Sequence, residues 1–277
     1  MGFGVFIDRE KCKRDGICVS ECPERAIEIG EDGYPRATTV GEQQCINCGH
    51  CVAFCPEGAF SLESMKPEQC DPVPEGISLS VEQVDALIRT RRSIRTYKKK
   101  QVSRDILEKV IGLACYAPTA KNLEPVHWLV IHDPQEVQRF GAMVIQWMRA
   151  MRSGESPAIF SKELLDLMIK DSEAGGDWIC RRAPHVIVAH GPNDLPIPAS
   201  PMACTIALTT LEVAAPVYGL GACWGGYFNK AINSFPPMLE ALQIPENHDC
   251  HGAMMIGYPV YGSHRIPARK TARISWR

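Results

Sequence analysis

Residues 45–56 read CINCGHCVAFCP, and this short run sets the organisation of the N-terminal part of the chain. Its cysteines follow the spacing Cys45-x2-Cys48-x2-Cys51-x3-Cys55, and a proline comes directly after the last one. Three thiols two residues apart can converge on one cluster of iron and sulfide. The alternative is a zinc knuckle or buried structural cysteines, but zinc sites use two cysteine pairs separated by a longer loop. The run therefore predicts an iron–sulfur site that carries electrons.

The same pattern occurs once more, earlier in the chain, with one substitution. Cys12, Cys18 and Cys22 repeat the second motif at an offset of 33 residues, and a proline again follows the last cysteine. Asp15 stands where the repeat would place a cysteine. The similarity continues in ERAIEIG and EGAFSLE, which follow the two motifs and each read as a short strand. These residues form an internal repeat rather than two unrelated cysteine groups.

Over about 65 residues this repeat resembles a bacterial ferredoxin with two [4Fe-4S] clusters. The resemblance implies a crossed ligand pattern, in which the last cysteine of each motif serves the cluster of the other. One cluster would be held by Cys45, Cys48, Cys51 and Cys22. The other would be held by Cys12, Cys18 and Cys55, with Asp15 as the candidate fourth ligand. A domain this small has little core, so the clusters would supply much of its stability.

Asp15 is the departure from the ferredoxin pattern, and two interpretations stay open. A carboxylate is a harder ligand than a thiolate and binds cluster iron less well. As a ligand, Asp15 would leave one labile iron, so that the cluster interconverts between [4Fe-4S] and [3Fe-4S] forms. As a structural residue, it would only cap a turn before Gly16 while solvent occupies the position. The register of Asp15 within the repeat favours the ligand.

Composition and charge exclude several classes of protein. The formal charge of −2 gives no reason to expect nucleic acid or an anionic membrane as partner. No apolar run approaches the roughly 20 residues of a membrane span, and the N-terminus lacks a basic region and cleavage site. Seven of the 13 cysteines lie in the two motifs, so free thiols and metal clusters fit better than a disulfide scaffold. We expect a cytoplasmic protein.

Beyond the repeat, the composition predicts a linker and a second domain. We expect a ferredoxin-like domain over residues 1–65, a proline-containing linker over 66–79 and a larger domain over 80–277. Ser80 and Gln83 form a capping-box pattern at the start of the first helix of that domain. Apolar periodicity predicts helices over 80–91, 103–117, 134–172 with a break at SGESP, and 201–218, and strands over 127–133, 183–191 and 251–260. The fold class is α+β, with a central sheet flanked by helices.

Four stretches of the second domain can carry chemistry, although each is ordinary when taken alone. RRSIR (91–95) offers forked donors to phosphate or carbonyl oxygens, but it also reads as a solvated basic turn, and a nucleic-acid patch would need interleaved aromatic residues. APTAKNLEP (117–125) is a loop with hydrogen-bonding side chains. GLGACWGG (219–226) reads as a glycine-rich turn that lets backbone approach a ligand. HRIPARK (264–270) is a second basic loop.

Together and in this order, the four stretches resemble the nitroreductase family of FMN flavoproteins, over about 80–277. The resemblance implies an obligate homodimer with FMN at its interface. Flavin phosphate and ring oxygens would be bound by Arg91, Arg92, Ser93 and Arg95. Pro118, Thr119 and Asn122 would come from the other subunit, Gly225 and Gly226 would lie near the reactive edge of the ring, and Arg269 with Arg265 would reach the phosphate. Glu124 replaces the family's usual Gln and is not assigned. No catalytic side chain is implied, because the flavin does the chemistry.

Combining the two resemblances predicts an oxidoreductase that passes electrons from an external donor through two clusters to FMN and on to an organic acceptor. The acceptor would be a nitroaromatic, a quinone or an activated alkene, and Trp147 and Phe160 are candidates for its pocket or for the core. Ferredoxin, flavodoxin and NAD(P)H are candidate donors. Two alternatives stay open: a flavin-remodelling or reductive-dehalogenating enzyme on the same fold, and an electron-transfer subunit of a larger complex.

Overall fold

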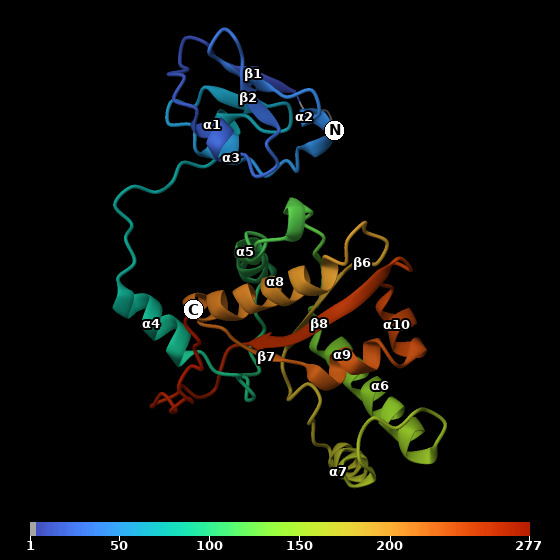
Figure 1. The fold of residues 1–277 in the computed structure, drawn as a ribbon. Coiled ribbons are helices and arrows are strands. Elements are labelled where there is room, and N and C mark those ends of the chain that lie inside the picture. Colours follow the sequence, from blue (N-terminus) through green and yellow to red (C-terminus); the bar gives the residue numbers. More distant parts are fainter. Residues whose placement is uncertain (1–3) are drawn as a thin grey trace. The chain divides into compact units, whose positions relative to one another are not determined.

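A computed structural model describes residues 4–277 of the chain (Figure 1). Contacts divide these residues into two compact units, which we describe separately. The first holds residues up to Ser78 together with Ala120–Leu123, and the second holds Leu79–Thr119 and Glu124–Arg277. The main division lies at the end of the expected linker, whose only regular element is a 3-10 turn over Pro67–Gln69.

The first unit is built from two small antiparallel sheets and three one-turn helices. Strand β1 (Val5–Ile7) pairs with β4 (Phe60–Leu62), β2 (Ile27–Ile29) pairs with β3 (Pro35–Ala37), and the helices are α1 (Ile17–Ser20), α2 (Gly41–Gln44) and α3 (His50–Ala53). Both α1 and α3, and both β2 and β4, are related by the 33-residue offset of the sequence. The internal repeat is therefore also a structural repeat.

The core of the first unit is small. Its buried members are two cysteines and four apolar residues: Cys18, Cys51, Ile27, Val52, Phe60 and Leu62. A unit of this size buries too little apolar surface to be stable by packing alone, and such domains usually depend on metals or disulfides. All 13 cysteines of the chain are free thiols, so disulfides are not what stabilises it.

The second unit begins with α4 (Val81–Thr90), which starts as its sequence predicts. Gln83 N donates to Ser80 Oγ (3.2 Å), and Ser80 N donates to Gln83 Oε1 (2.9 Å), so the capping box is formed. No residue of α4 is buried, however, and the side chain of Val81 is 80% exposed. Among the described residues, Val84 and Ile88 of its apolar face are exposed as well, and only Leu87 is partly buried.

A four-stranded antiparallel sheet forms the centre of the second unit. Its strands are β5 (His127–Ile131), β6 (His185–Pro192), β7 (Gly221–Trp224) and β8 (His248–Gly257), in the order β5-β6-β8-β7. The two inner strands are buried almost throughout, which explains why they read as continuous apolar runs in the sequence.

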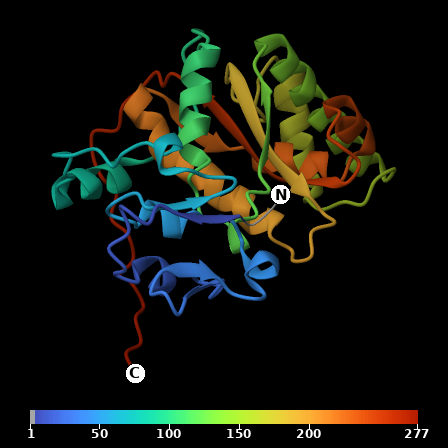
Figure 2. The ribbon, with the colours of Figure 1, turned by 90° about the horizontal axis from the view of Figure 1, so that it is seen from above.

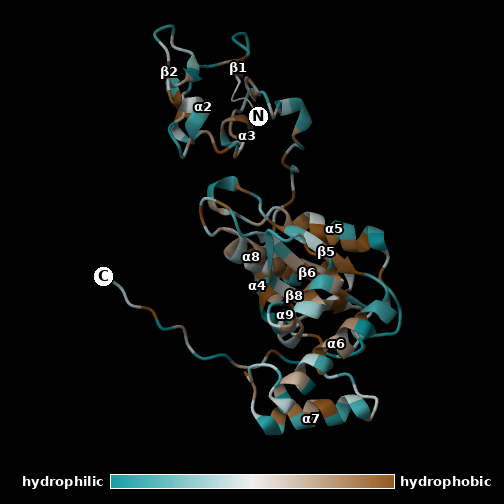
Figure 3. Ribbon diagram, turned by 90° about the vertical axis from the view of Figure 1, so that its right-hand side faces the viewer, coloured by the Kyte–Doolittle hydropathy of each residue, from teal (hydrophilic) through white to brown (hydrophobic). Residues whose placement is uncertain are grey.

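Helices cover both faces of this sheet and make a three-layer α+β unit, as expected. They are α5 (Arg104–Ala114), α6 (Pro134–Ser153), α7 (Lys162–Glu173), α8 (Ser200–Ala214), α9 (Gly226–Ile232) and α10 (Pro236–Leu242). Side chains of α5 and α8 pack on one face, and those of α6, α7, α9 and α10 pack on the other (Figures 1 and 2). Hydrophobic residues gather around β5, β6 and α5 in Figure 3. The break in the long helical segment 134–172 is present, between α6 and α7.

The structure corrects one element and adds two. Gly221–Trp224, expected as part of a glycine-rich turn, is an edge strand that pairs with β8 from Gly221 opposite Gly257 to Trp224 opposite Met254. The reason is steric, because a Cβ at Gly221 would collide with Ile94, so glycine is needed for close packing and not for a turn. The short helices α9 and α10 between β7 and β8 were not expected.

The expectation that no apolar run approaches a membrane span needs qualification. Ser200–Tyr218, which contains α8 and the 3-10 turn Ala215–Tyr218, has the length and hydropathy of such a span. Its residues Cys204, Leu208 and Leu211 are fully buried against α5 and the sheet. This is the packing of a core helix.

Candidate functional site

Two cavities in the first unit are each lined by four candidate ligands. The first is lined by Cys22, Cys45, Cys48 and Cys51, and the second by Cys12, Asp15, Cys18 and Cys55. Cys22 therefore lies with the cysteines of the later motif, and Cys55 lies with those of the earlier motif. This is the crossed arrangement that the resemblance implied.

Equivalent backbone features shape both cavities. Gly16 and Gly49 precede α1 and α3 in the left-handed conformation, with φ of 75° and 72°, which places the following helical turn against the thiols. Ala26 N donates to Cys22 Sγ (3.2 Å), and the repeat provides the same bond from Ala59 N to Cys55 Sγ (3.2 Å). Amide hydrogen bonds to sulfur stabilise thiolate and cluster charge, and they tune cluster potentials.

The electrostatics of the thiols also separate into two groups. Burial, followed by the proximity of Cys55 and Cys12, raises the pKa of Cys18 to about 11. Burial, followed by the proximity of Cys45, Cys48 and Cys22, raises the pKa of Cys51 to about 12. Without a cation these thiols stay protonated, whereas bound iron deprotonates its thiol ligands. Buried thiols with raised pKa values, grouped around one cavity, are therefore suited to ligating a metal cluster.

The spacing of the thiols favours a cluster over a single ion. Among residues 4–277, no group of three or more His, Cys, Asp or Glu side chains is arranged to hold one metal ion. A zinc site would draw four sulfurs to about 2.3 Å from one centre. Thiols that line a common cavity without converging on one point fit a larger body, as a four-iron cluster is.

Asp15 satisfies part of both interpretations. Its Oδ1 accepts a hydrogen bond from Ile17 N (3.1 Å), which closes a turn at Gly16 as the structural interpretation requires. The same side chain lines the second cavity with Cys12, Cys18 and Cys55. Asp15 Oδ2 accepts no hydrogen bond within the part of the chain that the structure describes. Capping and iron ligation are therefore compatible at this residue.

In the second unit, three of the expected FMN residues meet around one cavity of about 290 Å³. Arg95, Gly225 and Gly226 line it, together with Phe160, Trp178, Ile179, Arg181, Cys223, Trp224, Tyr227, Lys230 and Met255. The segment before Arg95 is fixed to the sheet, because Ile94 N donates to Ala222 O (2.9 Å). Gly225 N donates to Ala253 O (2.8 Å), which fixes the start of α9 beside β8.

Two features of the second unit offer space and a hydrogen-bond donor to a ligand, and only the first of them borders this cavity. A Cβ at Gly226 would meet no atom within 4 Å, so open space lies beside the backbone at this position. Arg92 Nη2 is buried and has no hydrogen-bond partner, although Arg92 Nη1 donates to the carbonyl oxygens of Arg89 and Arg91. A buried guanidinium donor without a partner is costly, and a ligand phosphate or carbonyl would satisfy it.

Arg91 differs from its neighbours because its charge is already neutralised. Its Nη1 lies 2.9 Å from Oε1 of Glu212, a side chain only 6% exposed. This ion pair connects the segment after α4 to the buried face of α8. Arg91 therefore has a structural role in addition to any contact with a ligand.

The remaining expected FMN residues do not line the cavity. Ser93 is one of them, and the other five lie in two loops. Pro118, Thr119 and Asn122 belong to the loop after α5, where Thr119 Oγ1 accepts from Glu124 N (3.1 Å). Arg265 and Arg269 lie in the exposed C-terminal segment 260–277. None of these five lines the cavity. Trp147, a candidate for the pocket, is 1% exposed in the core, whereas Phe160 does line the cavity.

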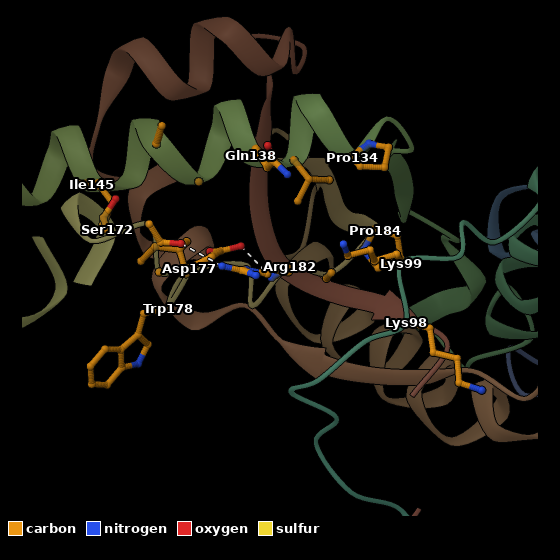
Figure 4. Close-up of a pocket in the computed structure, with 17 residues that line it drawn as sticks. Lys98, Lys99, Pro134, Gln138, Ile145, Ser172, Asp177, Trp178, Arg182 and Pro184 are labelled. Atoms are coloured by element: carbon orange, nitrogen blue, oxygen red, sulfur yellow. Dashed lines mark hydrogen bonds between the residues drawn. The ribbon is translucent and has the colours of Figure 1, made fainter. Parts of the chain in front are cut away.

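A larger cavity of about 510 Å³ lies between α6 and the segment 175–184 and holds none of the expected site residues (Figure 4). The two cavities share Trp178 and Ile179. Asp177 organises this shared segment, since its carboxylate accepts from Cys180 N and Arg182 N, both at 2.8 Å. Figure 4 shows Asp177 beside Arg182. Sequence reasoning missed Trp178, Arg181 and Lys230, because no motif marks them and only the fold brings them together.

Family models match both parts of the chain. Residues 88–258 match the model of the nitroreductase family, and residues 4–56 match that of a 4Fe-4S dicluster domain. A protein of Archaeoglobus fulgidus, named for NADH dehydrogenase or NAD(P)H nitroreductase activity, is 26% identical over 179 residues, which are 62% of this chain and 83% of that protein.

Solved structures show the same fold. A nitroreductase with bound FMN from Bacteroides fragilis matches with a TM-score of 0.54 and 21% identity, over 69% of this chain and 95% of that one. An FMN-bound nitroreductase from Desulfitobacterium hafniense matches with a TM-score of 0.56 and 19% identity, over 72% of this chain and 99% of that one. The chain belongs to the nitroreductase family of oxidoreductases and carries a 4Fe-4S dicluster domain at its N-terminal end.

Proposed function

We propose that the protein relays electrons from an external donor through two [4Fe-4S] clusters to FMN, and that the acceptor is a small planar organic molecule. The crossed lining of two thiol cavities, in one chain with a nitroreductase domain, is the observation that carries this proposal. The clusters supply one-electron transfer, and FMN supplies the exchange between one-electron and two-electron chemistry.

The residues of the chain have separable roles in this proposal. The two sets of four ligands would hold the clusters, and N–H groups such as that of Ala26 would moderate the charge on sulfur. Arg92 Nη2 would donate to an oxygen of FMN, and the open space beside Gly226 would admit the edge of its ring. No side chain is required as nucleophile. Burial raises the pKa of Cys223, so this thiol stays protonated in the cavity.

The overall reaction balances with a donor of the ferredoxin, flavodoxin or NAD(P)H class. A nitro group takes two electrons and two protons and gives a nitroso group and water. A quinone takes two electrons and two protons and gives the hydroquinone. The structure does not require a protein base for either, because protons can come from solvent at the open cavity.

We also propose that the working form is a homodimer. The apolar face of α4 is exposed, and so is the C-terminal segment, in which Trp276 is 89% exposed. Arg265 and Arg269 do not reach the cavity within one chain, and neither does Thr119. A second copy would cover the apolar surface and complete the FMN site. Sedimentation equilibrium should give twice the mass of the chain, and Val84→Glu with Ile88→Glu should shift the protein to monomer with loss of FMN.

Anaerobic reduction tests the relay. Reduced ferredoxin should bleach the flavin absorbance of the wild-type protein, and Cys48→Ala should abolish this reduction while FMN stays bound. Cys70→Ala is the matched control, since Cys70 is exposed and lines neither thiol cavity. Unchanged flavin reduction in Cys48→Ala would refute the relay. Parallel reductions with NADH and NADPH identify the donor, and steady turnover by isolated protein would separate an enzyme from an electron-transfer subunit.

The expected cytoplasmic location belongs with this proposal. Thirteen free cysteines in one chain, eleven of them buried or partly buried, suit a reducing compartment. Low-potential donors and oxygen-sensitive clusters are also found there. Fractionation of the native host with detection of the untagged chain would test the location.

A further inference from the structure

The cavity beside Gly226 has an unusual balance of charge. Three cations, Arg95, Arg181 and Lys230, line it, and no Asp or Glu does. None of the three forms a salt bridge among the described residues. Glu212 lies near enough to raise the pKa of Cys223 in the cavity wall, but it is already paired with Arg91. The cavity therefore has net positive charge without a protein counterion.

The uncharged part of the same lining is largely aromatic. Phe160, Trp178, Trp224 and Tyr227 all contribute. The rings of Phe160 and Tyr227 meet edge to face, with centroids 5.4 Å apart. Aromatic walls favour planar, conjugated ligands by stacking and edge contacts. Together with the cations they describe a site for a planar molecule that carries negative charge.

Arg181 is held in place by its backbone. It has a left-handed φ of 54°, followed by 55° at Arg182, which is rare for residues other than glycine. The conformation persists because Asp177 accepts from the N–H groups of Cys180 and Arg182, and because Arg181 N donates to Asp177 O (3.1 Å). The two neighbouring arginines therefore line different cavities: Arg181 lines the smaller one, and Arg182, labelled in Figure 4, lines the larger one.

The cofactor does not account for all of these cations. In the proposed function the edge of the FMN ring enters beside Gly226, and Arg92, which does not line the cavity, donates to an FMN oxygen through its buried unpartnered Nη2. Arg95 belongs to the RRSIR segment expected to contact the flavin. Arg181 and Lys230 come from other parts of the chain, before β6 and on α9, and remain without a function.

We propose that Arg181 and Lys230 select an acceptor that carries a carboxylate, so that the substrate class is an aromatic acid with a reducible group rather than a neutral nitroaromatic or quinone. This inference rests on the proposed function, because it concerns the same cavity. Guanidinium and ammonium groups bind carboxylates by charge-assisted hydrogen bonds, and the aromatic walls hold the ring.

Binding can be measured without turnover. Isothermal titration of the oxidised holoprotein with benzoate and with benzamide compares an acid with a neutral molecule of the same shape. The acid should bind about tenfold more tightly or better, because charge-assisted bonds to two cations are lost with the amide. Arg181→Gln and Lys230→Gln should each bring the two affinities close together, and Arg181→Lys should keep most of the preference.

Arg182→Gln is the matched control, because it removes one positive charge from the same turn but at the other cavity. It should leave the preference for benzoate unchanged. The kinetic counterpart is the ratio of kcat/KM for 4-nitrobenzoate to kcat/KM for 4-nitrobenzamide. Arg181→Gln and Lys230→Gln should each lower this ratio, mainly by raising KM for the acid, whereas Arg182→Gln should leave it unchanged. FMN content and circular dichroism confirm that each variant is folded and loaded.

Each failure has a distinct signature. Equal affinities for benzoate and benzamide in the wild type, or a preference that survives both Arg181→Gln and Lys230→Gln, would overturn the inference. Loss of FMN from these two variants, with the preference for benzoate over benzamide unchanged, would assign Arg181 and Lys230 to cofactor binding. That result would also overturn the inference. The proposed function fails separately, if neither nitro compound is reduced under any donor although benzoate still binds selectively.

Discussion

His185 connects three segments of the second unit, and its protonation should control stability in mild acid. The side chain is fully buried. Its Nε2 accepts from Val102 N–H (2.8 Å), and its Nδ1 donates to His132 O (2.8 Å). Its ring stacks on that of His132, with centroids 4.4 Å apart. Because Nε2 must accept, the neutral form with the proton on Nδ1 is required.

The pH dependence follows from the pKa of this group. Burial, reinforced by the neighbouring His132, lowers the pKa of His185 to about 4, from 6.5 in the unfolded chain. A depressed histidine pKa means that the unfolded state binds the proton first as pH falls. The contribution of neutral His185 to the free energy of unfolding is therefore fully present above pH 6.5 and is lost as the pH falls from 6.5 towards 4. At about 1.4 kcal/mol per pH unit, roughly 2 kcal/mol should be lost by pH 5.

The variant His185→Gln isolates this effect. Glutamine can accept from Val102 N–H and donate to His132 O, but it does not titrate. Urea unfolding at fixed FMN concentration can be followed by tryptophan fluorescence, and all five tryptophans lie after residue 80, so the signal reports the second unit. Between pH 7.5 and pH 5, the free energy of unfolding of the wild type should fall by about 2 kcal/mol more than that of the variant. A constant difference across this range would refute the assignment of the titration to His185.

Three further predictions concern the cluster ligands and one buried ion pair. Cys22→Ser and Cys55→Ser should each lower the iron content by about half. Electron paramagnetic resonance of the reduced proteins should show that the two variants lose different clusters. Loss of the same signal from both variants would contradict the crossed ligand pattern. Mild oxidation of the wild type should give a three-iron signal that Asp15→Cys lacks, and a wild type without that signal would count against Asp15 as ligand. Glu212→Ala should lower the free energy of unfolding of the second unit by about 3 kcal/mol, because Arg91 is left partly buried without an anion. Glu246 is exposed, so the control Glu246→Ala should lower it by less than about 0.5 kcal/mol.

The cluster site could be predicted from sequence because its ligands are local. Cys45, Cys48 and Cys51 lie within one turn and its approach, so their spacing alone fixes that they can meet. The crossed cysteines, Cys22 and Cys55, required the resemblance, since nothing in their own neighbourhood shows that they reach the other motif. Their positions around the two cavities agree with it.

The second site could be predicted only in part, for physical reasons. Arg95, Gly225 and Gly226 belong to recognisable motifs, whereas Arg181 and Lys230 reach the cavity only because the sheet brings distant segments together. The structural use of Arg91 also depends on a partner 121 residues away along the chain.

The secondary structure shows the same division between local and long-range information. Helices and inner strands with clear periodicity were predicted within a few residues. Strand β7 was missed, because its glycine is required by the packing of Ile94, which no local pattern reveals. The apolar face of α4 was recognised in the sequence, but its exposure could be seen only in the structure.

The exchanged position of Cys22 and Cys55 has a consequence for assembly. In the proposed ligand sets neither half of the repeat supplies all four ligands of a cluster, so a partly synthesised chain that ends before Cys45 could not complete either one. Iron loading must then wait until both halves are made, and it joins them in a single cooperative step. Because each proposed cluster takes ligands from both halves, the cluster that survives oxygen damage would still hold the two halves together.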